Sequence, residues 1–315
     1  MMHPRGAKEF RIAIVGAGAV GCYYGSRLAA NGHDVHFLMR SDYAHVRDHG
    51  LRVKSRDGNF HLDNVNCYRT PAEIGPCDLV IVAIKATANG ALKTLLPPLL
   101  KPGTMVLTLQ NGLGNESFLS EHFGAERILG GLCFVCINRT APGVIEHTAQ
   151  GLISLGEYQR SPMTRTHQLQ QMLVESGIPS QVVSDLALER WRKLVWNIPF
   201  NGLSIAAGGV DVSEILRDPG LLQLARGLMQ EVIDLAARLE CPIPADFIDE
   251  NMERTCGMGR YQPSSLIDFL AGRAVEVEAI WGEPHRLAVA NGLNCGRLEA
   301  LYLLVKAVSE RNCRS

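Results

Sequence analysis

The stretch Phe10–Gly21, FRIAIVGAGAVG, decides the fold of the first half of this chain. Its apolar run, Phe10–Val15, is short and rich in β-branched residues, as expected for a strand covered on both faces of a sheet. A helix is expected directly afterwards, over Val20–Ala30. Strands alternating with helices predict βαβ units and a mostly parallel sheet. The other expected elements of this half are strands at Asp34–Leu38, Leu79–Ile84 and Thr104–Leu109, with helices over 88–100 and 116–122.

The turn between this strand and helix, Gly16-Ala17-Gly18-Ala19-Val20-Gly21, is a G-x-G-x-x-G. Gly16 permits a sharp turn, Gly18 lets a pyrophosphate approach the backbone, and Gly21 allows close packing of helix on strand. Amide groups at the helix N-terminus then hold the phosphates without any net positive charge. A tight turn without a ligand is the alternative, but the strand before it and the helix after it favour a dinucleotide site.

Composition favours a local binding site of this kind over a charged surface. The 315 residues carry 31 basic and 32 acidic side chains, which argues against a nucleic-acid binder or a polybasic membrane-surface protein. The opening MMHPRGAKEF has no apolar core of a secretory signal, and no apolar run is long enough for a bilayer span. Nine scattered cysteines do not suit a disulfide framework. We expect a cytoplasmic protein of two domains, without nucleic-acid or membrane partners.

Cofactor preference should be set where the second strand ends, at Phe37-Leu38-Met39-Arg40-Ser41. An NAD site usually places Asp or Glu there for the ribose 2′-hydroxyl, and no carboxylate stands at the expected point. Arg40 can instead bind a 2′-phosphate, so the sequence favours NADP (as NADPH) over NAD. An ordinary solvated arginine is the alternative. Lys85, just past the strand Leu79–Ile84, could add a second positive group at the adenosine end.

The pattern changes near residue 184, after which strand signals almost disappear. The fold class is therefore α/β, with a Rossmann-type, mostly parallel sheet domain over 1–184 and an all-α domain over 185–315. Shortly before the join, Gly143–His147 and Leu152–Leu155 look like a hairpin, and Met163–Ser176 like a helix. The helices expected in the second domain cover 186–198, 219–240, 244–256, 264–280 and 296–310.

Lys193, Asn197 and Asn201 are spaced i, i+4, i+8 on the first of these helices, which places them along one side of it. Polar residues in an otherwise apolar segment are expected in a cleft, where a partly desolvated lysine can exchange a proton near neutral pH. A surface lysine with two packing amides is the alternative. Pro199 removes one helix hydrogen bond between the two asparagines.

These motifs, in this order and spacing, resemble the ketopantoate reductase (2-dehydropantoate 2-reductase) family over nearly the whole chain. The residues that carry the resemblance are Gly16–Gly21, Arg40, Ile84-Lys85-Ala86, Leu109–Gly114, Trp191-Arg192-Lys193-Leu194, Asn197, Asn201, Ser264–Asp268 and Glu276–Gly282. The resemblance implies an NADPH-dependent reductase that converts 2-dehydropantoate to (R)-pantoate, with the dinucleotide held by Gly16, Gly18, Gly21, Arg40 and Lys85.

The resemblance also implies the roles of individual residues. Lys193 is the general acid that protonates the carbonyl oxygen, and Glu276 is the catalytic carboxylate that orients the lysine or the substrate hydroxyl. Asn111 corresponds to an asparagine on the nicotinamide side of the cofactor. Asn197, Asn201 and Ser264 correspond to substrate-binding residues. A helix-surface charge at Glu276 and an N-cap at Ser264 are the alternatives.

Some positions depart from the family's pattern, and more than one function stays open. Ser265-Leu266 and Glu276-Val277-Glu278 differ from the common runs, and Asp211 falls near a position where some members carry an amide. An NADP-dependent reductase of a different 2-oxo acid is the second possibility, and an NADP-sensing module without chemistry is the third. A homodimer is compatible with the sequence. No metal site is expected, and Cys133-Phe-Val-Cys136 is predicted to be part of a strand.

Overall fold

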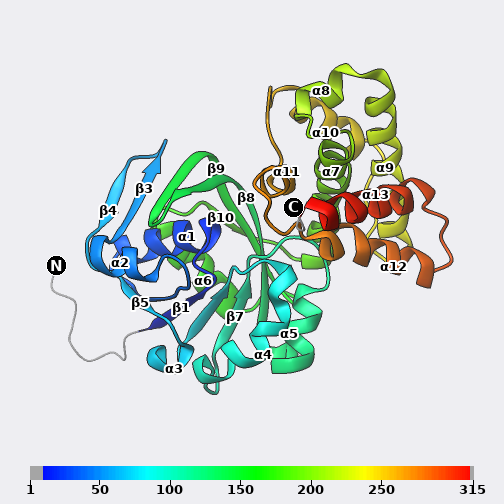
Figure 1. The fold of residues 1–315 in the computed structure, drawn as a ribbon. Coiled ribbons are helices and arrows are strands. Elements are labelled where there is room, and N and C mark those ends of the chain that lie inside the picture. Colours follow the sequence, from blue (N-terminus) through cyan, green and yellow to red (C-terminus); the bar gives the residue numbers. More distant parts are fainter. Residues whose placement is uncertain (1–9, 313–315) are drawn as a thin grey trace. The chain divides into compact units, whose positions relative to one another are not determined.

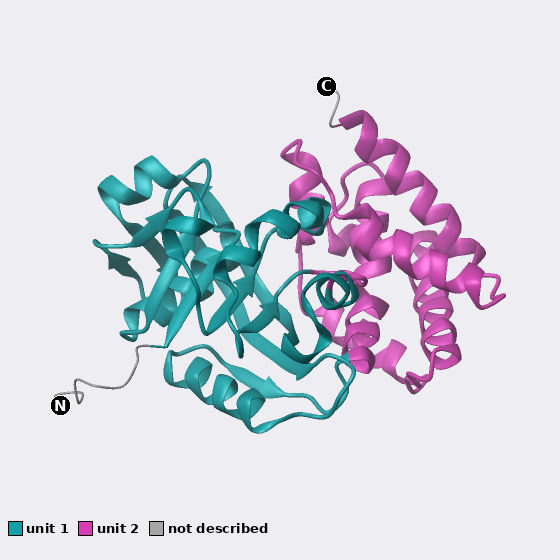
Figure 2. Ribbon diagram, turned by 90° about the horizontal axis from the view of Figure 1, so that it is seen from below, with its two compact units in different colours: residues 1–110, 116–186 teal, residues 111–115, 187–315 magenta. Residues whose placement is uncertain are grey.

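The structure, a computed structural model, describes residues 10–312. Residues 1–9, on which the expectation about a secretory signal rests, and residues 313–315 lie outside the described part. Contacts within the chain divide it into two compact units (Figure 2). Unit 1 runs to Gln110 and resumes over Glu116–Leu186, whereas unit 2 consists of Asn111–Asn115 and the chain from Ala187 onward.

Unit 1 is built on one sheet with the order β4-β3-β9-β8-β7-β6-β1-β2-β5, and β10 pairs with β9 (Figure 1). Each pair from β5 across to β8 is parallel, β8 and β9 are antiparallel, and β3 and β4 are antiparallel. The expected mostly parallel sheet is confirmed. The strands are β1 Arg11–Val15, β2 Asp34–Leu38, β3 Leu51–Ser55, β4 Phe60–Leu62, β5 Asn66–Tyr68, β6 Leu79–Val82, β7 Met105–Thr108, β8 Ile128–Ala141, β9 Val144–Glu157 and β10 Ser180–Val182.

Helices cover both faces of this sheet, which explains the continuous apolarity of its central strands. Along β1, Ile12 and Ile14 face a core shared with α1 and α6, whereas Ala13 and Val15 face a second core shared with α3, α4 and α5. The helices of unit 1 are α1 Ala19–Ala30, α2 Tyr43–His49, α3 Pro71–Ile74, α4 Leu92–Leu95, α5 Asn115–Phe123 and α6 Thr164–Glu175, with 3₁₀ turns at Ala86–Ala91, Pro97–Leu99 and Ala125–Arg127.

Two sequence expectations in unit 1 are wrong. Gly143–His147 and Leu152–Leu155 do not pair with each other, because nearly all of both runs lies on the single strand β9, whose partner is β8. A bulge at Gln150 and Gly151, both with positive φ, separates the two runs and gave the sequence its hairpin-like break. The helix expected over 88–100 is broken into two 3₁₀ turns around α4, because Pro97 and Pro98 cannot continue an α-helix.

Over its described residues, unit 2 contains helices and loops but no strand, as expected. Its central helix, α7, runs over Leu186–Ala206 through Pro199, and its side chains Leu194, Val195 and Ile198 are almost fully buried. Over residues 10–312, no helix is long and apolar enough to cross a bilayer. The other helices of unit 2 are α8 Val212–Arg217, α9 Pro219–Arg238, α10 Phe247–Cys256, α11 Ser264–Leu270, α12 Glu283–Ala290 and α13 Gly296–Asn312, with a π-helical turn at Glu278–Gly282.

The single helix expected over 264–280 is also wrong. Helix α11 ends at Leu270, and Gly272, with φ of 64°, adopts the left-handed conformation that terminates helices. A short irregular stretch follows before the π-helical turn begins at Glu278. As a consequence, Glu276 does not lie on a helix surface but on the segment that leads into that turn.

Candidate active site

The glycine-rich turn of unit 1 has the geometry that its sequence predicts. A Cβ on Gly16 would stand 2.4 Å from the Ile84 amide nitrogen, and one on Gly21 would stand 2.2 Å from the Gly16 carbonyl oxygen. A Cβ on Gly18, the N-cap of α1, would meet nothing within 4 Å. Gly16 and Gly21 are therefore required by packing, whereas the backbone at Gly18 is open to a ligand. This cradle fits a pyrophosphate at a helix N-terminus.

The end of β2 carries an exposed arginine and an occupied carboxylate. Arg40 is exposed, two residues beyond the last residue of the strand. Asp42 is buried, and its Oδ1 accepts from Arg139 Nη1 at 2.5 Å and from Ser41 Oγ at 2.8 Å. Its Oδ2 accepts from the Gly143 amide at 3.2 Å. Both carboxylate oxygens of Asp42 are thus used within the protein.

A second arginine follows the neighbouring strand end. Strand β5 pairs in parallel with β2, and the Met39 amide donates to the Tyr68 carbonyl at 2.9 Å. Arg69 is exposed, with its guanidinium 4.8 Å from the centre of the Tyr43 ring. On the other side of β1, Lys85 is exposed and begins the 3₁₀ turn that follows β6. The carboxyl edge of the sheet therefore presents three basic side chains, two of which, Arg40 and Lys85, were expected.

In unit 2, the lysine of α7 contacts the asparagine of the loop after β7. Lys193 Nζ donates to Asn111 Oδ1 at 2.9 Å, although the two residues are 82 positions apart in sequence. Asn115 Nδ2 donates to the Asn111 carbonyl at 2.9 Å, which fixes the backbone beside this contact. The structure thus brings together the expected general acid and the expected nicotinamide-side asparagine.

The loop that carries Asn111 is held against the segment after Glu276. The Leu113 amide donates to the Ala279 carbonyl at 2.8 Å. Gly112 has φ of 82°, and a Cβ there would stand 2.3 Å from the same carbonyl oxygen. Only glycine fits this approach without displacing the backbone. Glu276 itself is 6% exposed, so the alternative of a solvated surface charge is wrong.

The two asparagines of α7 have different surroundings. Asn201 is 2% exposed, its Nδ2 donates to the Asn197 carbonyl, and its Oδ1 accepts from the Ser265 amide at 3.0 Å. Asn201 therefore anchors the start of α11, where Ser264 is the first residue and is exposed. Pro263 is the N-cap, and no side chain caps this helix, so Ser264 is not a capping residue. Asn197 is partly exposed.

Asp211 is part of a helix cap. Its Oδ1 accepts from Ser213 Oγ and from the Glu214 amide at the start of α8, and its Oδ2 accepts from Arg260 Nε at 3.0 Å. The Ser213 hydroxyl, together with Arg260 and the Glu214 amide, lowers the pKa of Asp211 from 3.8 to about 2. The carboxylate is thus committed to α8 and to Arg260, which explains an acid at this position.

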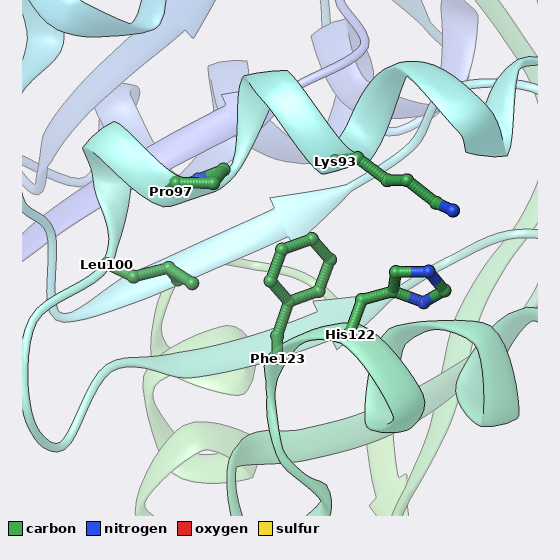
Figure 3. Close-up of a pocket in the computed structure, with 5 residues that line it drawn as sticks. All are labelled: Lys93, Pro97, Leu100, His122 and Phe123. Carbon is green, nitrogen blue, oxygen red and sulfur yellow. The ribbon is translucent and has the colours of Figure 1, made fainter.

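Other features of the described part carry no expected site residue. A shallow hollow on unit 1 is lined by Lys93, Pro97, Leu100, His122 and Phe123 (Figure 3). Over residues 10–312, no group of three His, Cys, Asp or Glu side chains is placed to hold a metal ion. Cys133 and Cys136 both lie on β8 as unbridged thiols.

Comparison with known protein families covers both units. The family model described as ketopantoate reductase PanE/ApbA matches residues 12–160, and the model of the C-terminal region of the same family matches residues 185–309. The chain belongs to the ketopantoate reductase family. The expected family is thereby confirmed, and the two matches cover the sheet unit and the helical unit in turn.

Individual members of the ketopantoate reductase family are similar over nearly their full lengths. A protein of Nostoc sp. named 2-dehydropantoate 2-reductase is 42% identical over 309 residues, which are 96% of this chain and 97% of the relative. A crystal structure of 2-dehydropantoate 2-reductase from Geobacter metallireducens superposes with a TM-score of 0.92 at 45% identity, covering 94% of this chain and 99% of that one. A structure of D-mandelate dehydrogenase with NADH and anilino(oxo)acetate has a TM-score of 0.87 at 22% identity and covers 96% and 99%, which shows a shared fold.

Sequence reasoning missed the residues around Arg40. Asp42 stands two positions after Arg40, but nothing local indicates that Arg139, 97 residues away, binds it. Arg69 follows a strand of three residues, Asn66–Tyr68, which is too short to show a period. Only the pairing of β5 with β2 brings Arg69 to the strand end that carries Arg40.

Proposed function

We propose that this protein reduces 2-dehydropantoate to (R)-pantoate with NADPH, a step of pantothenate and coenzyme A synthesis. Family membership and the 42% identical relative named 2-dehydropantoate 2-reductase support this function. The observation that carries it is the contact between Lys193 and Asn111. The proposed roles are catalytic for Lys193 and Glu276, cofactor-binding for Gly16, Gly18, Gly21, Arg40, Lys85 and Asn111, and substrate-binding for Asn197, Asn201 and Ser264. We propose residues 1–184 as the cofactor domain and 185–315 as the substrate domain, with the segment Asn111–Asn115 contacting the latter.

The residues of unit 1 fit a phosphorylated dinucleotide. The open backbone at Gly18 would receive the pyrophosphate, and Arg40 would bind the 2′-phosphate, since the nearby Asp42 carboxylate is already paired. Lys85 adds a positive charge at the same edge of the sheet. When bound, NADPH supplies the hydride for the 2-oxo carbon.

The residues of unit 2 supply the proton for the carbonyl oxygen of the substrate. Hydride transfer builds negative charge on the carbonyl oxygen, and a cationic donor stabilises that charge while it gives up a proton. Lys193 is this donor. Asn111 Oδ1 accepts one of its hydrogens at 2.9 Å, which orients the ammonium group. Glu276, nearly buried in the same unit, is the carboxylate proposed to orient the lysine or the substrate hydroxyl.

Initial rates across a panel of 2-oxo acids, measured with NADPH and with NADH, test the proposed function. We expect fastest oxidation of NADPH with 2-dehydropantoate. Turnover of another oxo acid at a much higher kcat/KM would contradict the substrate but keep the chemistry. Tight NADPH binding with no turnover of any oxo acid would favour the sensing module. Preference for NADH would contradict the role given to Arg40.

Reduction of a different 2-oxo acid is the second candidate, and the surroundings of Asn201 are the observation that favours it. Both ends of the Asn201 amide are bound to main-chain groups, so this side chain has less capacity for substrate than its position in the family implies. Asn197 and Ser264 are left as the neutral donors of the set. Phenylglyoxylate and branched aliphatic oxo acids therefore belong in the panel.

A homodimer and a cytoplasmic location stay predictions. Light scattering after size-exclusion chromatography would give the mass of the particle in solution. A mass of about 34 kDa would contradict the dimer, because one chain has a mass of 34.4 kDa.

A further inference from the structure

The segment after β2 carries a negative charge, on Asp42, as well as the positive charge of Arg40. Arg40 and Asp42 lie two residues apart on the segment that follows the strand, and their charges oppose each other. A free carboxylate here would accept from a ribose 2′-hydroxyl and repel a 2′-phosphate. The state of Asp42 therefore matters as much as the presence of Arg40.

The negative charge of Asp42 is offset by an arginine that is distant in sequence, Arg139. Arg139 comes from β8, and its guanidinium reaches Asp42 Oδ1 and Ser41 Oγ. The Gly143 amide, in the turn between β8 and β9, occupies the other carboxylate oxygen. The carboxylate side chain is 8% exposed, so few solvent molecules compete with these donors.

This ion pair lies close to the glycine-rich turn. Cys22 directly follows Gly21 in α1, and burial raises the pKa of its thiol to about 12. The charges of Asp42 and Arg139 both act on the Cys22 thiol, in opposite directions. The Cys22 sulfur donates to the Ala17 carbonyl at 3.2 Å, so the thiol on which both charges act lies against the glycine-rich turn.

Arg69 adds a positive charge at the end of the strand next to β2. It follows β5, whose Tyr68 pairs with Leu38 of β2, so Arg40 and Arg69 leave adjacent strand ends in the same direction. Over residues 10–312, neither guanidinium forms an ion pair within 4.0 Å, although the charge of Arg69 contributes, after the hydrogen bonds from Thr70, to lowering the pKa of Glu73. Arg69 rests on the Tyr43 ring, and Arg47 stands over the same ring at 5.7 Å but is bound to Asp48 at 2.8 Å.

We propose that the Arg139–Asp42 ion pair, together with Arg69 beside Arg40, sets the preference for a dinucleotide with a 2′-phosphate over one with a free 2′-hydroxyl. The ion pair removes the carboxylate that would select NADH. The two arginines then supply donors for the phosphate oxygens. This inference rests on the proposed function only for the presence of a nicotinamide dinucleotide.

Equilibrium binding of NADPH and NADH, followed by nicotinamide fluorescence without any oxo acid, tests the ion pair. Arg139→Gln should weaken NADPH binding about tenfold and leave NADH binding unchanged or tighter, because the negative charge of Asp42 is then no longer offset by a cation. The double variant Arg139→Gln with Asp42→Asn should restore most of the NADPH affinity, since the freed carboxylate is then absent. Circular dichroism confirms that each variant is folded.

Arg69→Ala tests the second arginine, and Arg47→Ala is its matched control on the same tyrosine ring. Arg69→Ala should weaken NADPH binding about tenfold without changing NADH binding. Arg47→Ala should change neither, because Asp48 already offsets its charge.

Three results would overturn the inference. The first is an unchanged ratio of NADPH to NADH affinity in folded Arg139→Gln. The second is a double variant Arg139→Gln with Asp42→Asn in which that ratio is not restored. The third is an equal loss of affinity for both dinucleotides in Arg69→Ala. Failure of the wild-type protein to bind either dinucleotide would instead contradict the proposed function, so the two failures are distinguishable.

Discussion

Lys193 Nζ donates a hydrogen bond to Asn111 Oδ1 at 2.9 Å. The amide oxygen accepts a hydrogen bond from the lysine but is too weak a base to take its proton. It therefore fixes the direction of the side chain without competing for the transferable proton. The partner comes from a five-residue segment that belongs to the helical unit although it follows a strand of the sheet unit. The position of the lysine therefore depends on that segment as well as on α7.

Replacement of the lysine should remove the chemical step. Lys193→Ala should lower kcat/KM for 2-dehydropantoate by about 10²- to 10⁴-fold, the usual contribution of a positioned general acid. Stopped-flow and equilibrium fluorescence should show NADPH binding unchanged. Lys93→Ala removes an exposed lysine of unit 1 and is the control. Equal kcat/KM in Lys193→Ala and wild type would rule out the proposed role.

Two glycines of the same loop give a matched pair of variants. Gly112 and Gly114 have φ of 82° and 84°, but a Cβ on Gly112 would stand 2.3 Å from the Ala279 oxygen, whereas the nearest atom to one on Gly114 is at 3.8 Å. Gly114→Ala should cost about 1–2 kcal/mol of stability from the backbone alone. Gly112→Ala should also displace Asn111 and lower kcat. Similar kcat values in the two variants would contradict this positioning role.

Asn201 and Asn197 should separate stability from substrate binding. Asn201→Ala leaves the buried Ser265 amide without its acceptor, which should cost about 1–3 kcal/mol and also raise KM through the start of α11. Asn197→Ala should raise KM for the oxo acid with little change in unfolding free energy, since the Asn197 side chain is partly exposed. Urea unfolding and steady-state kinetics measure the two quantities. Unchanged stability of Asn201→Ala would mean that the Ser265 amide finds another acceptor.

The cap at Asp211 predicts a pH dependence of stability. Its folded-state pKa of about 2 lies below the ordinary 3.8, so its contribution is present above about pH 4 and is lost as the pH falls towards 2. Asp211→Asn should therefore be less stable than wild type at pH 6, with the difference shrinking between pH 4 and pH 2. Thermal unfolding at several pH values measures it. A constant difference across this range would show that the charge of Asp211 is not the cause.

The sequence predicts the central strands and most helices because each has its own local pattern. FRIAIV is apolar on both faces, and the structure places its alternate residues in two separate cores. The errors arose where a local pattern was interrupted by a single backbone feature. The bulge at Gln150 and Gly151 divided one strand into two apparent ones, and the left-handed Gly272 ended a helix that the periodicity extended to residue 280.

Residue types and spacing indicated the candidate site, but its contacts required the fold. The sequence shows that Lys193 and Asn201 share one side of a helix, yet not that one contacts Asn111 and the other the Ser265 amide. Such contacts join residues far apart in sequence, and no local propensity records them. For the same reason, the state of Asp42 could not be inferred without Arg139.

The assignment of Asn111–Asn115 to unit 2 has a consequence for dividing the chain. The polypeptide passes from one unit to the other after Gln110, after Asn115 and after Leu186, so no single cut yields two complete modules. A fragment that starts at Ala187 would lack Asn111 as well as the Leu113 amide that binds Ala279. In a chimaera that takes residues from Ala187 onward from a relative, the Asn111–Asn115 loop of this chain would pack against side chains of the relative's helical unit. A functional exchange of the helical unit between relatives would therefore require that the five residues Asn111–Asn115 be exchanged together with the helices.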